Sequence, residues 1–167
     1  MHPLMKNRKN IQPQRSELPT SSLSPGGQLF VWSVRQWLRS SLEKRCVKRD
    51  LLAPHHNVGC TEAIVHLDEF MCALSIGAHR KIEVRPPECG LVSGDEIRLL
   101  ELMRAGQRGD RDSARAIAAG LVAGHTVSPL VNIATDYGLQ LEVAGIDLCG
   151  LRFLRMIDTA NAAVAAS

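Results

Sequence analysis

Apolar residues recur at helical spacing over most of the chain from residue 24 to about residue 160. The clearest case is Ala114, Ile117, Ala118 and Leu121, which lie at i, i+3, i+4 and i+7, the spacing of one buried helix face. Similar stripes predict helices that begin near residues 24, 61, 93, 110, 128 and 147. The pattern therefore predicts an all-α fold, a compact bundle of five to six helices.

Polar residues mark where several of these helices begin. Ser93 followed by Glu96 is a capping box, in which each side chain accepts a hydrogen bond from the backbone of the other residue. Ser24 and Ser128 are each followed by proline, which suits the first helical position. The first helix is predicted to run to about Arg49, and the helix that begins at Ser128 is predicted to end at Gly138.

Two short stretches alternate apolar and polar residues with a period of two. Residues 81–85 and 139–143 show this pattern, which is typical of strands. They could pair as one short two-stranded ribbon, or each could be irregular loop. Residues 54–59, which include Pro54 and Gly59, are predicted to be a loop.

Length and composition favour one domain behind a tail. A chain of 167 residues suits a single domain with one core. Residues 1–23 contain three prolines, four Lys or Arg and few apolar side chains, and are predicted to be a disordered basic tail. Residues 24–160 are predicted to form the helical domain, and the Ala-rich residues 161–167 a frayed C-terminus.

The chain carries no stretch that predicts a membrane span or a secretory signal. Its longest uncharged apolar run, residues 116–124, is about half of what a spanning helix needs. The five cysteines form no C-x-x-C pair and are predicted to be reduced thiols. We therefore expect a cytoplasmic protein.

Positive charge is concentrated in the first part of the chain. Residues 1–50 contain ten Lys or Arg and three acids, whereas residues 51–167 contain ten and fourteen. A basic helix face could bind nucleic acid or an acidic partner, or could be an ordinary solvated surface. The candidate face consists of Arg35, Arg39, Lys44, Arg45, Lys48 and Arg49.

One segment resembles a known DNA-binding element. Residues 126–132, with the Ala-rich helix before them, resemble the recognition helix of a lac-repressor type helix-turn-helix. The resemblance implies insertion of this helix into the major groove. The segment departs from the motif at Leu121, where a turn glycine is expected, and at Pro129; Asn132 is its only side chain suited to contacting bases. The alternative is a helical hairpin.

Two groups of residues are candidates for metal binding. A structural zinc ion takes four nitrogen or sulfur ligands, and Cys60, Cys72, His79 and Cys89 could supply them, with His55 or His56 as further candidates. A second metal site is conceivable at Glu62, His66 and Glu69, which share one helix face. The alternatives are buried thiols and the solvated side of an amphipathic helix.

Catalytic motifs are not found in the sequence. It contains no glycine-rich phosphate loop, G-x-S-x-G, H-E-x-x-H or dinucleotide fingerprint. This favours a non-enzyme without a cofactor, although catalytic sites can be assembled from distant residues. The sequence predicts an accessory or regulatory protein that acts through protein–protein contacts. The alternatives are a nucleic-acid-binding module that uses the basic helix and tail, and a zinc protein that uses residues 55–89.

Overall fold

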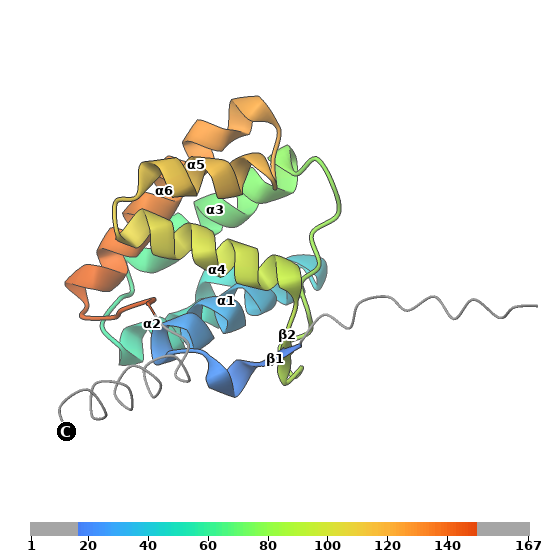
Figure 1. The fold of residues 1–167 in the computed structure, drawn as a ribbon. Helices are drawn as coiled ribbons and strands as arrows, with labels where there is room; N and C mark the ends of the chain where they lie inside the picture. The colour runs from blue at the N-terminus through green and yellow to red at the C-terminus, as the bar shows by residue number, and fades with distance from the viewer. Residues whose placement is uncertain (1–16, 150–167) are drawn as a thin grey trace, which may run out of the picture.

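The computed structural model describes residues 17–149, a bundle of helices with one short antiparallel ribbon at its edge (Figure 1). The all-α fold class is confirmed. Residues 1–16 of the predicted tail, and the predicted helical and frayed parts beyond residue 149, lie outside the described residues. The described helices are α1 (Pro25–Leu42), α2 (Val47–Asn57), α3 (Ala63–Gly77), α4 (Gly94–Gln107), α5 (Arg111–Ala119) and α6 (Gly124–Val143).

The ribbon is formed by residues other than those expected. It pairs β1 (Leu18–Pro19) with β2 (Leu91–Val92), with Leu18 opposite Val92. Residues 139–143 belong to α6 instead, where Leu141 is buried while Leu139 and Val143 face solvent. Residues 81–85 belong to no helix or strand, which is the irregular loop offered as the alternative. The period-two patterns were therefore misleading, as short apolar alternations can be.

The structured domain begins earlier than residue 24. A 3-10 turn (Thr20–Ser22) follows β1. Thr20 donates hydrogen bonds to the Gly90 carbonyl from its backbone N–H (2.8 Å) and from its hydroxyl (3.2 Å). Leu23 is 1% exposed. The predicted boundary at residue 23 is therefore wrong, because these residues bury apolar surface and satisfy backbone groups.

The predicted helix from residue 24 to Arg49 is two helices with a turn between them. Lys44 adopts a left-handed backbone conformation (φ 55°), which reverses the chain after α1. The Asp50 carboxylate accepts a hydrogen bond from the Ser40 hydroxyl (2.7 Å) and lies 3.2 Å from the Arg45 guanidinium. These contacts join the end of α1 to the start of α2. The predicted loop at residues 54–59 is correspondingly shorter, because α2 continues through Pro54 to Asn57.

Helix α6 starts before the predicted cap and continues beyond Gly138. It begins at Gly124, so Pro129 lies inside it. Proline cannot donate to the carbonyl of His125, but His125 is exposed and water can reach that carbonyl. The expected helix start at Ser128 and end at Gly138 are therefore wrong.

The core is centred on α4 and α6. Helix α6 packs against α3, α4 and α5, while α4 also contacts α1, and Figure 1 shows α4 running across the middle of the bundle. The fully buried ring of Tyr137 lies 5.8 Å from that of Phe30, whose centroid is 6.4 Å from that of Phe70. None of the helices between residues 17 and 149 is long and apolar enough to cross a membrane.

Two glycines allow α4 and α6 to approach closely. A Cβ atom at Gly106 would lie 2.7 Å from the Ala134 carbonyl oxygen, and one at Gly138 would lie 2.7 Å from the Gln107 Cα. Both neighbours are backbone, which cannot rotate away as a side chain can. The absence of side chains at these positions thus sets the distance between the two helices.

We predict that Gly106→Ala destabilises the domain by about 1–3 kcal/mol, because overpacking outweighs the better helix propensity of alanine. Gly124→Ala is the matched control, since no atom lies within 4 Å of the added methyl group. Urea unfolding followed by circular dichroism measures both. Equal midpoints for Gly106→Ala and Gly124→Ala would contradict the close approach.

Candidate functional site

A buried ion pair between α1 and α4 organises the surface beside α1. Arg35 Nε lies 2.7 Å from Glu96 Oε1, and Arg35 Nη2 lies 2.9 Å from Glu96 Oε2. The two side chains are only 2% and 0% exposed. The Arg35 guanidinium also donates to the carbonyls of Cys89 and Leu91, both at 2.7 Å. The planar guanidinium of arginine, with donors that point in several fixed directions, can make all of these contacts at once.

Glu96 completes the predicted capping box, which is confirmed. Its carboxylate accepts the Ser93 backbone N–H (2.8 Å), and the Ser93 hydroxyl accepts the Glu96 N–H (3.1 Å). Glu96 also accepts the backbone N–H of Arg85 (3.0 Å). Through Arg35 and Glu96, the backbone is thus held at Arg85, Cys89, Leu91 and Ser93.

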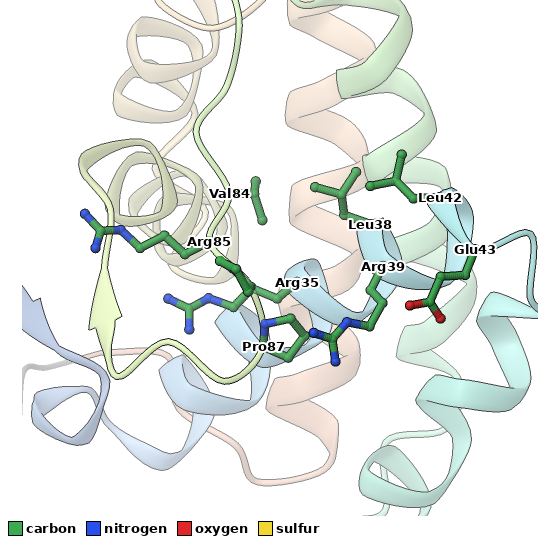
Figure 2. A pocket seen from close by; sticks show the side chains of 9 residues that line it. Arg35, Leu38, Arg39, Leu42, Glu43, Val84, Arg85 and Pro87 are labelled. Atoms are coloured by element: carbon green, nitrogen blue, oxygen red, sulfur yellow. The ribbon is translucent and has the colours of Figure 1, made fainter.

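The segment held in this way forms one wall of a surface groove, with α1 as the other wall. Figure 2 shows Leu38, Arg39 and Leu42 on α1, with Val84 and Pro87 on the facing segment. The groove has a volume of about 280 Å³. Leu42 is 75% exposed, although it is a large apolar side chain. The residues that line the groove are Arg35, Leu38, Arg39, Leu42, Glu43, Val84, Arg85, Pro86 and Pro87.

The charged groups around the groove are mostly paired within the chain. Arg39 Nη2 donates to Glu88 Oε2 (2.7 Å), and this bond raises the pKa of Arg39 and lowers the pKa of Glu88. In Figure 2 the guanidinium of Arg85 points away from Leu38 and Leu42, and it donates to Glu17 (2.6 Å). Arg39 is therefore the arginine best placed to meet a molecule in the groove.

The predicted basic face is divided by the structure. Arg35 does not belong to it, because its guanidinium is buried against Glu96. Arg39 lies at the groove. The other four residues are exposed around the turn between α1 and α2 and are here called the basic turn: Lys44, Arg45, Lys48 and Arg49.

The predicted zinc ligands do not come together. Cys60 is buried in the core, Cys72 is exposed on α3, and the exposed His79 lies 3.3 Å from the Ala119 carbonyl. Cys89 lies beside Arg85, 3.9 Å from its Nη1. Between residues 17 and 149, no three His, Cys, Asp or Glu side chains are arranged to hold a metal ion.

The second predicted metal set is equally unsupported. His66 Nδ1 lies 3.6 Å from Glu69 Oε2, but Glu62, His66 and Glu69 do not form a metal-holding group. Glu62 and Glu69 are exposed on the outer face of α3. The two glutamates match the solvated face that the sequence offered as the alternative, whereas His66 is half-buried.

The helix-turn-helix resemblance also fails to produce a DNA-reading surface. Thr126 is 9% exposed, and Leu130 and Val131 are buried in the core. The exposed Asn132 is bonded through its side-chain oxygen to Arg111 (3.0 Å). Helix α6 thus uses this face for packing, as a helical hairpin does.

Cys89 is a feature that the sequence did not distinguish from the other cysteines. The Leu91 backbone N–H and the Arg85 guanidinium lower the pKa of its thiol, because both stabilise the thiolate. Burial instead raises the pKa of the Cys60 thiol. The difference in pKa between these two thiols depends on tertiary contacts, which the spacing of residues along the sequence does not indicate.

Comparison of the chain with protein-family models, with curated proteins and with solved structures gave no match. The functional proposal therefore depends on the geometry of the described residues.

His55, the additional zinc candidate, is instead a buried core residue. It is 0% exposed, and its Nδ1 donates to the Leu51 carbonyl (2.8 Å). Its Nε2 is then an acceptor, and it has no hydrogen-bond partner within the described part of the chain. Burial lowers the pKa of His55 below its ordinary 6.5, because the imidazolium would be charged in the core.

We predict that the free energy of unfolding falls as pH decreases below about 6.5. The unfolded chain binds a proton at His55 more readily than the folded chain does, so stability is retained above the unfolded pKa and lost as pH falls toward the folded pKa. His55→Leu should flatten this part of the pH dependence, and His56→Leu, which removes an exposed histidine, should not. Urea unfolding between pH 5 and pH 7.5 tests this; identical pH dependence in wild type and His55→Leu would contradict it.

Proposed function

We propose that this chain is an accessory or regulatory protein that acts through protein contacts, and that the groove beside α1 receives apolar side chains of its partner. The observation that carries the proposal is the 75% exposure of Leu42 at a groove whose other apolar lining includes Leu38, Val84 and Pro87. Removing such apolar surface from water is the main favourable term in protein association. Partner contacts also concentrate where an anchor residue fills a pocket.

The way the groove is built supports binding to a preformed surface. Arg35 and Glu96 hold the backbone on both sides of Pro86 and Pro87, and prolines have little backbone freedom of their own. A wall fixed before binding has little conformational entropy left to lose. Preorganisation of this kind favours affinity.

The dimensions favour a protein partner over a small substrate. A volume of about 280 Å³ is at the lower limit of small-molecule pockets, which typically measure roughly 300–1,000 Å³. The titratable side chains of the lining are Arg35, Arg39, Glu43 and Arg85. Among them only the Glu43 carboxylate has nucleophilic or acid–base chemistry, and it is about half exposed and lies 3.1 Å from the Arg45 guanidinium. A partner side chain fits such a groove better than a reacting molecule does.

A second candidate function is nucleic-acid binding through the basic turn. Lys44, Lys48 and Arg49 are exposed, and they form no ion pair with any residue between 17 and 149. Binding to phosphates would weaken steeply as salt increases. It would not require Leu42, which separates this candidate from the first.

On the composition of the chain, we retain the cytoplasm as the proposed location of the protein.

We predict that Leu42→Ser weakens partner binding about tenfold or more, as expected for an apolar anchor. Random twelve-residue peptides displayed on phage are selected on the full chain, and the affinities of enriched peptides are measured by fluorescence anisotropy. Ile76→Ser is the matched control, because Ile76 is 86% exposed and does not line the groove. Both variants should unfold at the wild-type temperature, since both side chains already face solvent.

Peptides that bind wild type and Ile76→Ser but not Leu42→Ser would support the groove as the contact surface. Failure to enrich any peptide, or equal binding to all three proteins, would contradict the proposed function.

A further inference from the structure

The basic turn begins immediately beyond the apolar end of the groove. Leu42 is the last residue of α1, Lys44 lies two residues later, and Lys48 and Arg49 follow in the first turn of α2. Figure 2 shows Glu43 beyond Leu42 at this end of the groove. An apolar surface and a cationic surface are therefore continuous along one short segment.

The cations of the basic turn differ in whether they form ion pairs within the chain. Arg45 Nε lies 3.1 Å from Glu43 Oε2 and 3.2 Å from Asp50 Oδ2, so it holds the turn together. Lys44, Lys48 and Arg49 have no such partner between residues 17 and 149. Three positive charges thus remain available to another molecule.

The positions of these charges are unfavourable for α2 itself. The sequence suggested that Lys48 and Arg49 end a helix, where cations stabilise the helix dipole. In the structure both lie in the first turn of α2, where the positive end of the dipole disfavours cations. Lys44 also occupies a left-handed backbone position (φ 55°), which is uncommon for lysine. Helix stability therefore does not explain why these positions carry cations.

We propose that the partner is a protein segment in which apolar anchor residues are followed or preceded by a run of Asp and Glu side chains. The anchors would occupy the groove at Leu38 and Leu42, and the carboxylates would meet the basic turn. This inference rests on the proposed function and specifies the chemistry of the partner. Its basis is charge complementarity next to an apolar groove, a combination that gives an interface both affinity and orientation.

The groove itself already shows how a carboxylate is received there. Arg39 binds the carboxylate of Glu88, which is 66% exposed, with its own side chain 33% exposed. An incoming Asp or Glu could exchange with Glu88 on Arg39 without burying an unpaired charge. Exposed ion pairs of this kind contribute little to stability, so replacing Glu88 by another carboxylate costs little free energy.

The same features disfavour a nucleic acid as the occupant. A polyanion that followed the basic turn toward the groove would meet the carboxylates of Glu43 and Glu88. The apolar side chains of Leu38 and Leu42 offer no partner to phosphate. A protein segment can avoid both problems, because it can place apolar and acidic residues at separate positions.

The test uses peptides selected on the full chain from the random twelve-residue library. We expect peptides that depend on Leu42 to combine apolar residues with an excess of Asp and Glu. Removing the three unpaired cations of the basic turn by Lys44→Asn, Lys48→Gln and Arg49→Gln should weaken their binding roughly three- to tenfold at low salt, as expected for rim charges. Raising the salt to about 0.5 M should reduce this difference, because the charges are then screened.

The matched control removes three other exposed arginines through Arg98→Gln, Arg108→Gln and Arg115→Gln. It lowers the net charge equally but leaves the basic turn intact, and we expect binding within about twofold of wild type. Equal weakening by both triple variants would show a non-specific effect of net charge and would overturn the inference.

The outcomes separate this inference from the proposed function. Peptides that require Leu42 but contain no excess of acidic residues would overturn the inference and leave the groove as a protein-binding surface. Absence of peptides that require Leu42 would overturn both. Binding of a labelled single-stranded oligonucleotide that requires the basic turn but not Leu42 would favour the nucleic-acid function instead.

Discussion

The buried pair of Arg35 and Glu96 is the interaction on which the candidate site depends. Two charges removed from water cost several kcal/mol unless their hydrogen-bonding capacity is filled. Here the guanidinium meets both oxygens of Glu96 and two backbone carbonyls, while the carboxylate also accepts two backbone N–H groups. The pair is therefore an internal connector between α1, α4 and the segment that precedes β2.

This connector explains how an irregular segment can form a stable wall. Residues 81–90 contain no helix and no strand, so their backbone groups need other partners. Glu96 accepts the Arg85 N–H and Arg35 donates to the Cys89 carbonyl, while Asp95 and Ser93 bond to the two backbone groups of Glu83. The Gly90 carbonyl accepts two bonds from Thr20. Pro86 and Pro87 are held opposite α1 as a result. Rigidity of the groove thus comes from a long-range polar contact as well as from the apolar core.

Local signals predicted the helices better than their ends. The capping box at Ser93 and Glu96 involves residues three positions apart, so the sequence alone could indicate it. The break after Leu42 depends on contacts of Asp50 with Ser40 and Arg45, and the helical pattern continued across it. Strands of two residues, such as β1 and β2, are too short to show a period.

The candidate site was harder to predict, because its components are distant in the sequence. Arg35 and Glu96 are separated by 61 positions, and helical spacing gave no reason to choose this arginine for burial. Arg35 was therefore included in the predicted basic face. Helical spacing placed Leu38 on the core-facing side of the first helix, whereas the structure places it in the groove, opposite Val84 and Pro87. The cations near residue 48 were visible in the sequence, but their position at the start of a helix was not.

The most direct test of the central claim is amide hydrogen exchange in the Arg35→Lys variant. Lysine keeps the charge but cannot make the forked contacts to Glu96 and the two carbonyls. We predict that exchange at Arg85 and Ser93, whose N–H groups donate to Glu96, becomes about tenfold faster or more, while amides in the core of α6 keep their protection. Arg98→Lys is the control, because Arg98 is exposed on α4. Unchanged exchange at residues 85–93 in Arg35→Lys would contradict the claim that this pair holds the wall of the groove.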